Sequence, residues 1–170
     1  MLTPKKIYDK LIPTNPIGKV GYMKFSTKSK YGIKALVDLA GCSRDELVSI
    51  KIIAERQKIP DSYLEQLFST LRKAGIITSV KGPYGGYKLS DFPQNISVAQ
   101  IIRALDGELS VLTDKDKVTF QEDPLSYCIN TNLWEQLDQH VTDYLNNITL
   151  EDIKKQYTKM ISSESYMFYI

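Results

Sequence analysis

Residues 61–71 combine polar side chains that can read base pairs with an apolar stripe that can hold them in place. The apolar positions recur at helical spacing, so they predict one buried face of an α-helix. On the other face, Gln66 can pair with adenine and Glu65 can accept a hydrogen bond from cytosine in a DNA major groove. The residues predicted to contact base edges are Ser62, Tyr63, Glu65, Gln66 and Ser69.

Basic and glycine-rich segments follow this helix. Segment 72–75 is basic and ends in glycine, which is a helix stop signal, and the tip 81–86 joins two short β-prone runs at 76–80 and 87–89. Positive φ angles at Gly85 and Gly86 would let such a hairpin approach a duplex closely. The residues predicted to contact the DNA backbone or minor groove are Thr27, Lys28, Lys30, Tyr31, Arg72, Lys73, Lys81, Tyr84, Gly85 and Gly86. For Arg72 and Lys73, a stabilising charge effect at the helix C-terminus is the alternative.

Local capping signals predict four helices around the hairpin. The expected caps are Ser26 or Thr27, Ser49, Asp61 and Ser97. The helices they begin extend to about residues 40, 57, 73 and 105, and Leu47 with Val48 can pair as a short strand. Three helices and a hairpin within about 65 residues form a winged helix-turn-helix, whose third helix enters the major groove. The predicted fold class is mostly α with a small β-wing.

Charge is unevenly distributed along the chain. Residues 23–92 contain twelve Lys or Arg and seven Asp or Glu, whereas residues 93–170 contain six and twelve. The basic part coincides with the helix and hairpin, where phosphate charge would be neutralised. A solvated charged surface is the alternative explanation for the charge alone.

The remaining composition constrains the class of protein. No apolar run approaches the ~18 residues of a membrane span, and the N-terminus has no signal-peptide core. The two cysteines, Cys42 and Cys128, fit a reduced, cytoplasmic location.

A second amphipathic helix is predicted at 132–147, after a loop-like stretch at 107–126. It needs a surface to cover, which is either its own winged domain or the same helix of a second chain. Reading of palindromic DNA favours a two-fold dimer. The predicted dimer contacts are Leu133, Trp134, Leu137, Val141 and Leu145.

The chain is therefore divided into four parts. Residues 1–22 are expected to be a disordered arm or the result of a misassigned start, and residues 23–92 the DNA-binding domain. Residues 93–161 form a linker helix and dimerisation region, in which Thr149 caps a further short helix. Residues 162–170 form a polar spacer and an aromatic tail.

Several segments together resemble the winged-helix regulators of the IscR, NsrR and CymR (Rrf-two) family. They are Ser26–Tyr31, Ile53–Arg56, Tyr63–Leu67, Leu71–Gly75, Gly82–Tyr87 and Asn146–Leu150, within residues 23–153. The resemblance implies a dimeric DNA-binding transcription regulator, predicted to be a repressor at a palindromic promoter site. A redox or iron–sulfur sensor of the same family, or an interaction module that does not bind DNA, is the alternative.

Many members of this family hold an iron–sulfur cluster on three closely spaced cysteines before the long dimer helix. Here only Cys128 falls in that segment, and Cys42 lies far from it. Because clusters are normally held by several thiolates, no cofactor and no metal site is predicted. Cys128 is expected to be a small packing residue, with a reactive thiol as the alternative.

The tail resembles that of the cluster-free CymR type, which regulates cysteine metabolism and has cysteine synthase as its partner. The resemblance implies that Phe168, Tyr169 and Ile170 bind cysteine synthase, with the terminal carboxylate held by backbone donors. A tail packed on its own dimer is the alternative.

An enzyme is not predicted. The single histidine, His140, lies on the amphipathic helix, and a pairing with Cys128 as nucleophile and base has no supporting motif. A phosphate-cradling G-x-x-x-x-G-K-[ST] pattern is absent from the sequence.

Overall fold

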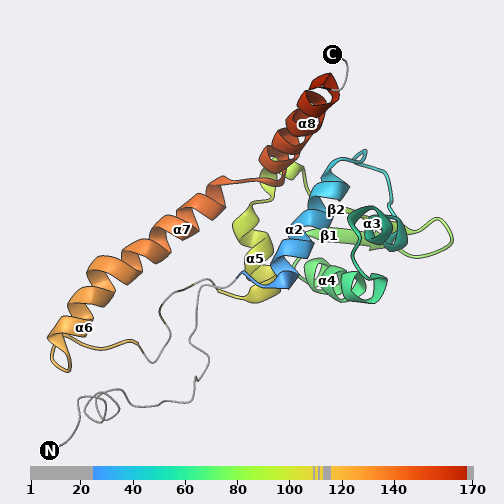
Figure 1. Ribbon diagram of the computed structural model, residues 1–170. Helices are drawn as coiled ribbons and strands as arrows, with labels where there is room; N and C mark the ends of the chain where they lie inside the picture. The colour runs from blue at the N-terminus through green and yellow to red at the C-terminus, as the bar shows by residue number, and fades with distance from the viewer. Residues whose placement is uncertain (1–24, 109, 111, 113–115, 168–170) are drawn as a thin grey trace, which may run out of the picture.

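The computed structural model describes residues 25–108, 110, 112 and 116–167. The elements in chain order are α2 (Thr27–Ala40), α3 (Ile50–Gln57), α4 (Asp61–Lys73), β1 (Ile77–Val80), β2 (Gly86–Leu89), the 3₁₀ turn η1 (Pro93–Asn95), α5 (Val98–Asp106), α6 (Pro124–Ile129), the π-helical turn η2 (Asn130–Trp134), α7 (Glu135–Asn147) and α8 (Leu150–Met167). Figure 1 shows a body of short helices and one hairpin, from which α6–α7 and α8 extend. The predicted fold class, mostly helical with a small β-wing, is confirmed. None of the helices in these ranges is long and apolar enough to span a membrane.

The body is held by one apolar cluster in which α2, α3, α4 and the hairpin meet. Leu36, Ile53 and Phe68 come from the three helices and are completely buried. The hairpin pairs Ile77 with Leu89 and Val80 with Gly86. Removing these side chains from water is the main stabilising contribution, about 25 cal/mol per Å² of apolar surface.

Helix α5 extends this core beyond the predicted domain boundary at residue 92. Its Ile101 and Leu105 belong to the same cluster as the winged part. A Cβ on Gly32 of α2 would lie 2.3 Å from Leu105 Cδ1, so the Leu105 side chain packs directly on the backbone of α2 and would have to move for any other residue at position 32. The α7–α8 junction is anchored here too, since Val98 N donates to Ile148 O (2.8 Å) and Leu150 N to Ile96 O (3.0 Å).

The ends of α2 and α5 are joined by a small polar network. Ser26 caps α2 by accepting from the backbone of Lys28 and Ser29. The Asp106 carboxylate accepts from Ser26 N (3.0 Å), from the Ser26 hydroxyl and from the buried Ser29 hydroxyl (2.7 Å). A carboxylate at a helix N-terminus also interacts favourably with the helix dipole.

Most predicted helix starts are confirmed, with Ser26, Ser49 and Ser97 as capping residues. The prediction for the third helix was wrong in detail. Pro60 occupies the N-cap position of α4, and Asp61 is its first helical residue, where its charge still suits the helix N-terminus. Leu47 forms no bridge, but Val48 pairs with Tyr87 as an added strand position.

The C-terminal elements differ from expectation. The predicted loop at 107–126 gives way to helix at Pro124, where Asp123 supplies the cap, and helical structure continues through η2 into α7. The short helix after Thr149 instead extends to Met167, so the expected polar spacer at 162–165 is helical. The hydroxyls of Ser162 and Ser163 donate hydrogen bonds back to the carbonyls of Thr158 and Met160, which lets these polar residues remain in a helix.

Replacing Asp106 by asparagine should lower the free energy of unfolding by about 1 kcal/mol at pH 7, because it weakens the cap of α2. Burial alone would raise the pKa of Asp106, but the hydrogen bonds from Ser26 and Ser29 lower it overall. A lowered pKa means that the stabilisation is complete above the unfolded carboxyl's value and is lost as pH falls through the folded one. Urea unfolding of both proteins should therefore show a difference at pH 7 that disappears in acid. The exposed Asp45, replaced by asparagine, is the control and should change stability little.

Candidate nucleic-acid interface

Helix α4 presents its polar face to solvent because its apolar face is buried in the core. Leu64, Leu67 and Phe68 are buried against the body. On the other side, Ser62, Glu65 and Gln66 are exposed, while Tyr63 and Ser69 are half-buried. The structure thus places the predicted base-reading residues on one accessible face, and their contacts with bases remain a prediction.

The turn between α3 and α4 is tight. Lys58 ends α3 in the left-handed conformation with φ 54°, which a non-glycine residue rarely adopts. Ile59 N donates to Ala54 O at 3.0 Å, and the Ile59 side chain is buried. These contacts fix the angle at which α4 leaves the turn.

The start of α2 lies beside the start of α4. Tyr31 and Tyr63 meet edge to face, with ring centroids 5.9 Å apart. Lys28 and Lys30 are exposed on the same end of α2 as Thr27. Two groups of predicted contacts that are more than thirty residues apart in sequence are therefore brought together.

The wing is fixed firmly to α4. The Phe68 ring packs edge to face on Tyr87 at 5.0 Å, and Tyr87 exchanges backbone hydrogen bonds with Val48 (3.0 and 2.9 Å). Arg72 also donates to Ser79 Oγ of β1 at 3.3 Å. Arg72 thus joins α4 to the wing, a role that sequence reasoning missed because it depends on the hairpin register.

Free positive charge surrounds these elements. Lys28, Lys30, Lys73 and Lys81 are exposed, and no salt bridge involves any of them within the described ranges. Unpaired cations of this kind can neutralise phosphates and release counterions.

The prediction for the paired glycines was wrong. Positive φ occurs at Gly82 (121°), not at Gly85 or Gly86. A Cβ on Gly85 would lie 2.2 Å from Val80 O, and one on Gly86 would lie 2.8 Å from Val48 backbone atoms. Gly85 thus permits close packing within the wing, and the buried Gly86 permits close packing of the wing on Val48. Their contacts with a duplex remain a prediction.

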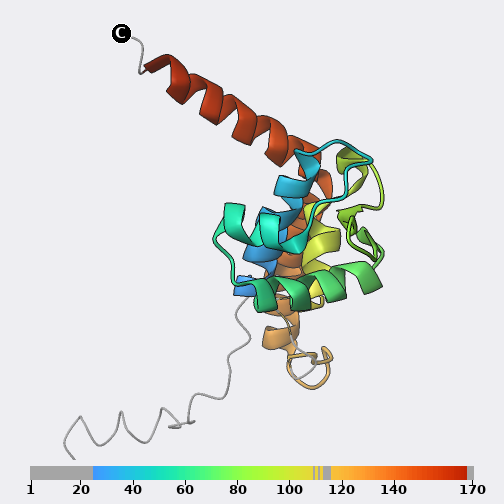
Figure 2. The ribbon, with the colours of Figure 1, turned by 90° about the vertical axis from the view of Figure 1, so that its right-hand side faces the viewer.

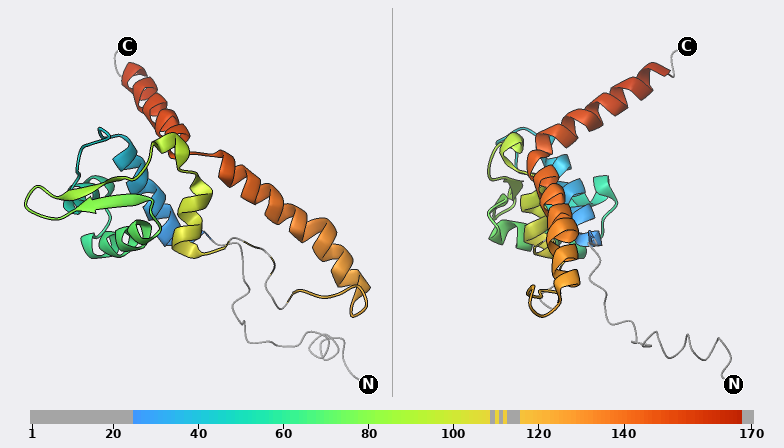
Figure 3. Two further views of the ribbon diagram at one scale, coloured as in Figure 1. Left: turned by 180° about the vertical axis from the view of Figure 1, so that it is seen from behind. Right: turned by 90° about the vertical axis from the view of Figure 1, so that its left-hand side faces the viewer.

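The predicted dimer contacts separate into two groups. Leu145 is only 8% exposed and packs on α5 with the half-buried Val141, so the end of α7 folds back on its own chain. Leu133 and Leu137 are 52% and 41% exposed. Figures 1 and 3 show α6–α7 running away from the body, which it meets only near the C-terminal end of α7, with α8 extending in another direction. Trp134 is half-buried.

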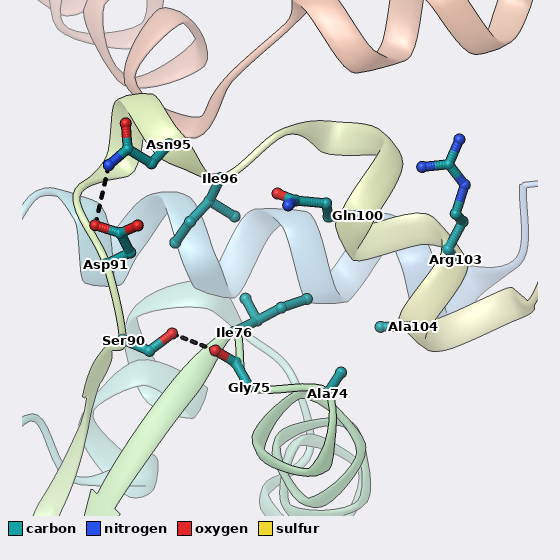
Figure 4. Close-up of a pocket in the computed structure, with 10 residues that line it drawn as sticks. All are labelled: Ala74, Gly75, Ile76, Ser90, Asp91, Asn95, Ile96, Gln100, Arg103 and Ala104. Atoms are coloured by element: carbon teal, nitrogen blue, oxygen red, sulfur yellow. Dashed lines mark hydrogen bonds between the residues drawn. The ribbon is translucent and has the colours of Figure 1, made fainter.

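A cleft of about 480 Å³ lies between the end of α4, the base of the wing and α5 (Figure 4). Its polar side chains bond to one another or to neighbouring elements. The Ser90 hydroxyl donates to Gly75 O, Asn95 donates to Asp91 (3.0 Å), and Arg103 donates to Asn146 of α7 (3.3 Å). The hydrogen bonds around the cleft thus join the base of the wing to the end of α4, and α5 to α7.

An enzymatic pairing of Cys128 with His140 does not fit this arrangement. The two residues are twelve positions apart in the continuous helical stretch from α6 to α7, or roughly 18 Å at 1.5 Å per residue. His140 Nδ1 lies 2.6 Å from the carbonyl of Gln136, within its own helix.

The comparisons with known proteins agree with this geometry. The family Rrf2, described as "Iron-dependent Transcriptional regulator", matches residues 25–156. The chain belongs to this family. Its members are transcription regulators and not enzymes, so a DNA-binding regulator is the function class.

Individual relatives share between 36% and 40% sequence identity with this chain. The regulator IscR of Vibrio campbellii is 40% identical over 133 residues, covering 78% of each chain. Among solved structures, CymR (YrzC), the global cysteine regulator of B. subtilis, has a TM-score of 0.66 at 36% identity, covering 78% of this chain and 97% of that one. T. potens IscR has a TM-score of 0.65 at 38% identity, covering 89% and 100%.

The residues present do not fit the iron that the family description names. Cys128 is exposed, and its nearest polar partner is Asn132 Nδ2 at 3.5 Å. Cys42 is half-buried after α2, where burial raises the pKa of its thiol. Within the described ranges, no three His, Cys, Asp or Glu side chains gather as a metal site. The tail residues Phe168, Tyr169 and Ile170, and the arm at 1–22, lie outside those ranges.

Replacing Glu65 by alanine should alter base preference more than general affinity. The change removes a hydrogen-bond acceptor and leaves the exposed lysines untouched, so we expect relaxed selection at one base pair, worth about 1–3 kcal/mol of discrimination. Selection of bound duplexes from a random pool measures the preference. Glu65→Gln removes the same charge but keeps the length, and it should change the preferred base. Equal losses on selected and random DNA for both variants would contradict the assignment.

Proposed function

We propose that two copies of this chain bind one palindromic promoter site, each placing α4 in the major groove and its wing at the flanking minor groove. The observation that carries the proposal is the exposed polar face of α4, with unpaired lysines at the start of α2 and on the wing. Polar side chains on a helix can read base edges, and lysines on either side can hold the phosphates.

The dimer is proposed from the part of α6–α7 that extends beyond the body. Leu137, Val141 and Leu145 are spaced four residues apart and form one stripe along α7. The stripe is buried on α5 at its C-terminal end, whereas Leu133 and Leu137 are exposed at the other end. A two-fold contact through these two leucines would present two copies of α4 to half-sites related by the same symmetry. Leu145 and Val141 then hold the C-terminal end of α7 on its own chain.

Repression of genes for cysteine or sulfur metabolism is the proposed regulatory role. Similarity to the B. subtilis cysteine regulator and the poor fit to iron support it over an iron or iron–sulfur sensor. A repressor needs no chemistry beyond occupying a promoter, which this surface can do. The cytoplasm predicted from the sequence suits such a role.

Cysteine synthase remains a predicted partner through Phe168, Tyr169 and Ile170. Helix α8 carries the chain outward as far as Met167, so the three residues follow an extended helix and not the expected irregular spacer (Figure 2). Calorimetry with the synthase, comparing the full chain with one that ends at residue 165, tests this partner.

An interaction module that does not bind DNA is distinguished by salt. Affinity of the proposed regulator for a duplex should fall steeply as salt rises, because each phosphate contact releases counterions. Replacing Lys81 by alanine should weaken binding to all sequences and reduce the slope of log affinity against log salt by about one. Lys159→Ala, on the exposed part of α8, is the matched control and should leave the slope unchanged. A wild-type slope near zero would support the interaction module.

Replacing Leu137 by aspartate should give monomers. Pairing of two such helices would bury an unpaired charge at a cost of several kcal/mol. Light scattering should show loss of the dimer, and mobility shift should show loss of tight binding to a palindrome. Gln139→Asp is the control, because two residues further along an α-helix lie on nearly the opposite side. An intact dimer of the Leu137 variant would refute the proposed contact.

A further inference from the structure

The wing ends in a single large side chain. Tyr84 is 95% exposed, the highest value among the large apolar side chains of the described residues. Among the residues that the structure describes, no ring packs on it, whereas Tyr31, Tyr63 and Tyr87 each pack on another ring. An aromatic ring held out into solvent at the end of a hairpin is available to a partner.

The tip that carries this ring is narrow and closed. Gly85 N donates to Gly82 O at 2.9 Å, which makes a tight turn with Pro83 and Tyr84 at its centre. Pro83 fixes its own φ angle, and Gly82 supplies the positive φ before it. A Cβ at Gly85 would lie 2.2 Å from Val80 O, so the two sides of the hairpin approach closely at the base of the tip.

The tip is also fixed in position relative to α4. The Phe68–Tyr87 ring contact, the Val48–Tyr87 pairing and the Arg72–Ser79 hydrogen bond all connect the wing to the helix or its neighbours. If α4 lies in a major groove, the distance along the duplex from its bases to the Tyr84 ring is therefore set by the protein. The wing tip and α6–α7 project on opposite sides of the body, so α6–α7 does not cover the tip (Figures 1 and 3).

We infer that the Tyr84 ring acts as a wedge in the minor groove beside each half-site, where it partly unstacks one base step. This inference rests on the proposed DNA-reading function and adds a specificity determinant to it. The minor groove is about 6 Å wide, and a hairpin whose tip bears only glycines, a proline and one ring can enter it. Apolar side chains that enter this groove unstack base steps.

The wedge selects DNA by deformability. Pyrimidine–purine steps such as TA are unstacked at the lowest cost, so a site should bind best with such a step at the position that Tyr84 reaches. The preference arises without a hydrogen bond to the bases. Lys81, two residues from Pro83, would hold a phosphate and contribute equally on every sequence.

The test uses the full-length protein and the duplex selected from a random pool. In a series of duplexes, a TA step is moved through the flank one base pair at a time. The affinity of each duplex is compared with that of a duplex whose flank has no pyrimidine–purine step. The fluorescence of 2-aminopurine placed in the flank reports unstacking. For the wild type, we expect one position at which TA raises affinity about tenfold and 2-aminopurine fluorescence rises on binding. Tyr84→Phe should keep both effects, because the ring remains.

Tyr84→Ala should bind the core site, lose the flank preference and give no fluorescence rise. Lys81→Ala is the control: it should weaken all flanks equally and keep the preference. The inference is overturned if Tyr84→Ala keeps the wild-type flank preference, or if Tyr84→Phe loses it, which would point to the hydroxyl. If the wild type binds no selected duplex at all, the proposed DNA-reading function fails together with the wedge. Circular dichroism checks that each variant is folded.

Discussion

The edge-to-face contact between Phe68 and Tyr87 is the interaction on which the arrangement of the candidate DNA-binding surface depends. Phe68 is fully buried on α4, and Tyr87 belongs to β2 while also pairing with Val48. One contact therefore connects the helix, the hairpin and the segment before α3. Ring pairs of this kind contribute about 0.5–1.5 kcal/mol beyond their burial, but here the geometric effect matters more. Together with the Val48–Tyr87 pairing and the Arg72–Ser79 hydrogen bond, this contact sets the position of the wing relative to α4.

A second set of contacts connects that surface to α7. The close approach of Gly32 to Leu105 and the Ser26–Ser29–Asp106 network tie the first turns of α2 to the end of α5. Helix α5 in turn packs on Leu145 of α7. A partner held on the exposed N-terminal part of α7 would thus be positioned relative to α4 through packed helices. One apolar stripe of α7 contacts α5 at its C-terminal end and is exposed at its N-terminal end.

Local signals in the sequence predicted more of the structure than long-range ones. The serine caps and the buried stripe of α4 depend on neighbours three or four residues away, and these predictions are confirmed. The glycine conformations depend on how Val80 pairs with Gly86, so the positive φ was assigned to the wrong residues. The contact of Ser26 with Asp106 joins residues 80 positions apart. No local pattern can show it, and the same holds for Arg72 with Ser79.

Helix α6 begins in the segment where the family resemblance would place an iron–sulfur cluster. The Asp123 carboxylate accepts from the backbone and hydroxyl of Ser126 (3.0 and 2.6 Å), and these hydrogen bonds lower the pKa of that carboxyl. Pro124 follows in the first turn of α6, where a missing N–H costs nothing. Cap, proline and helix are thus all specified by the local sequence. This helix therefore takes its cap and first turn from its own sequence, in a chain whose cysteines do not suit iron.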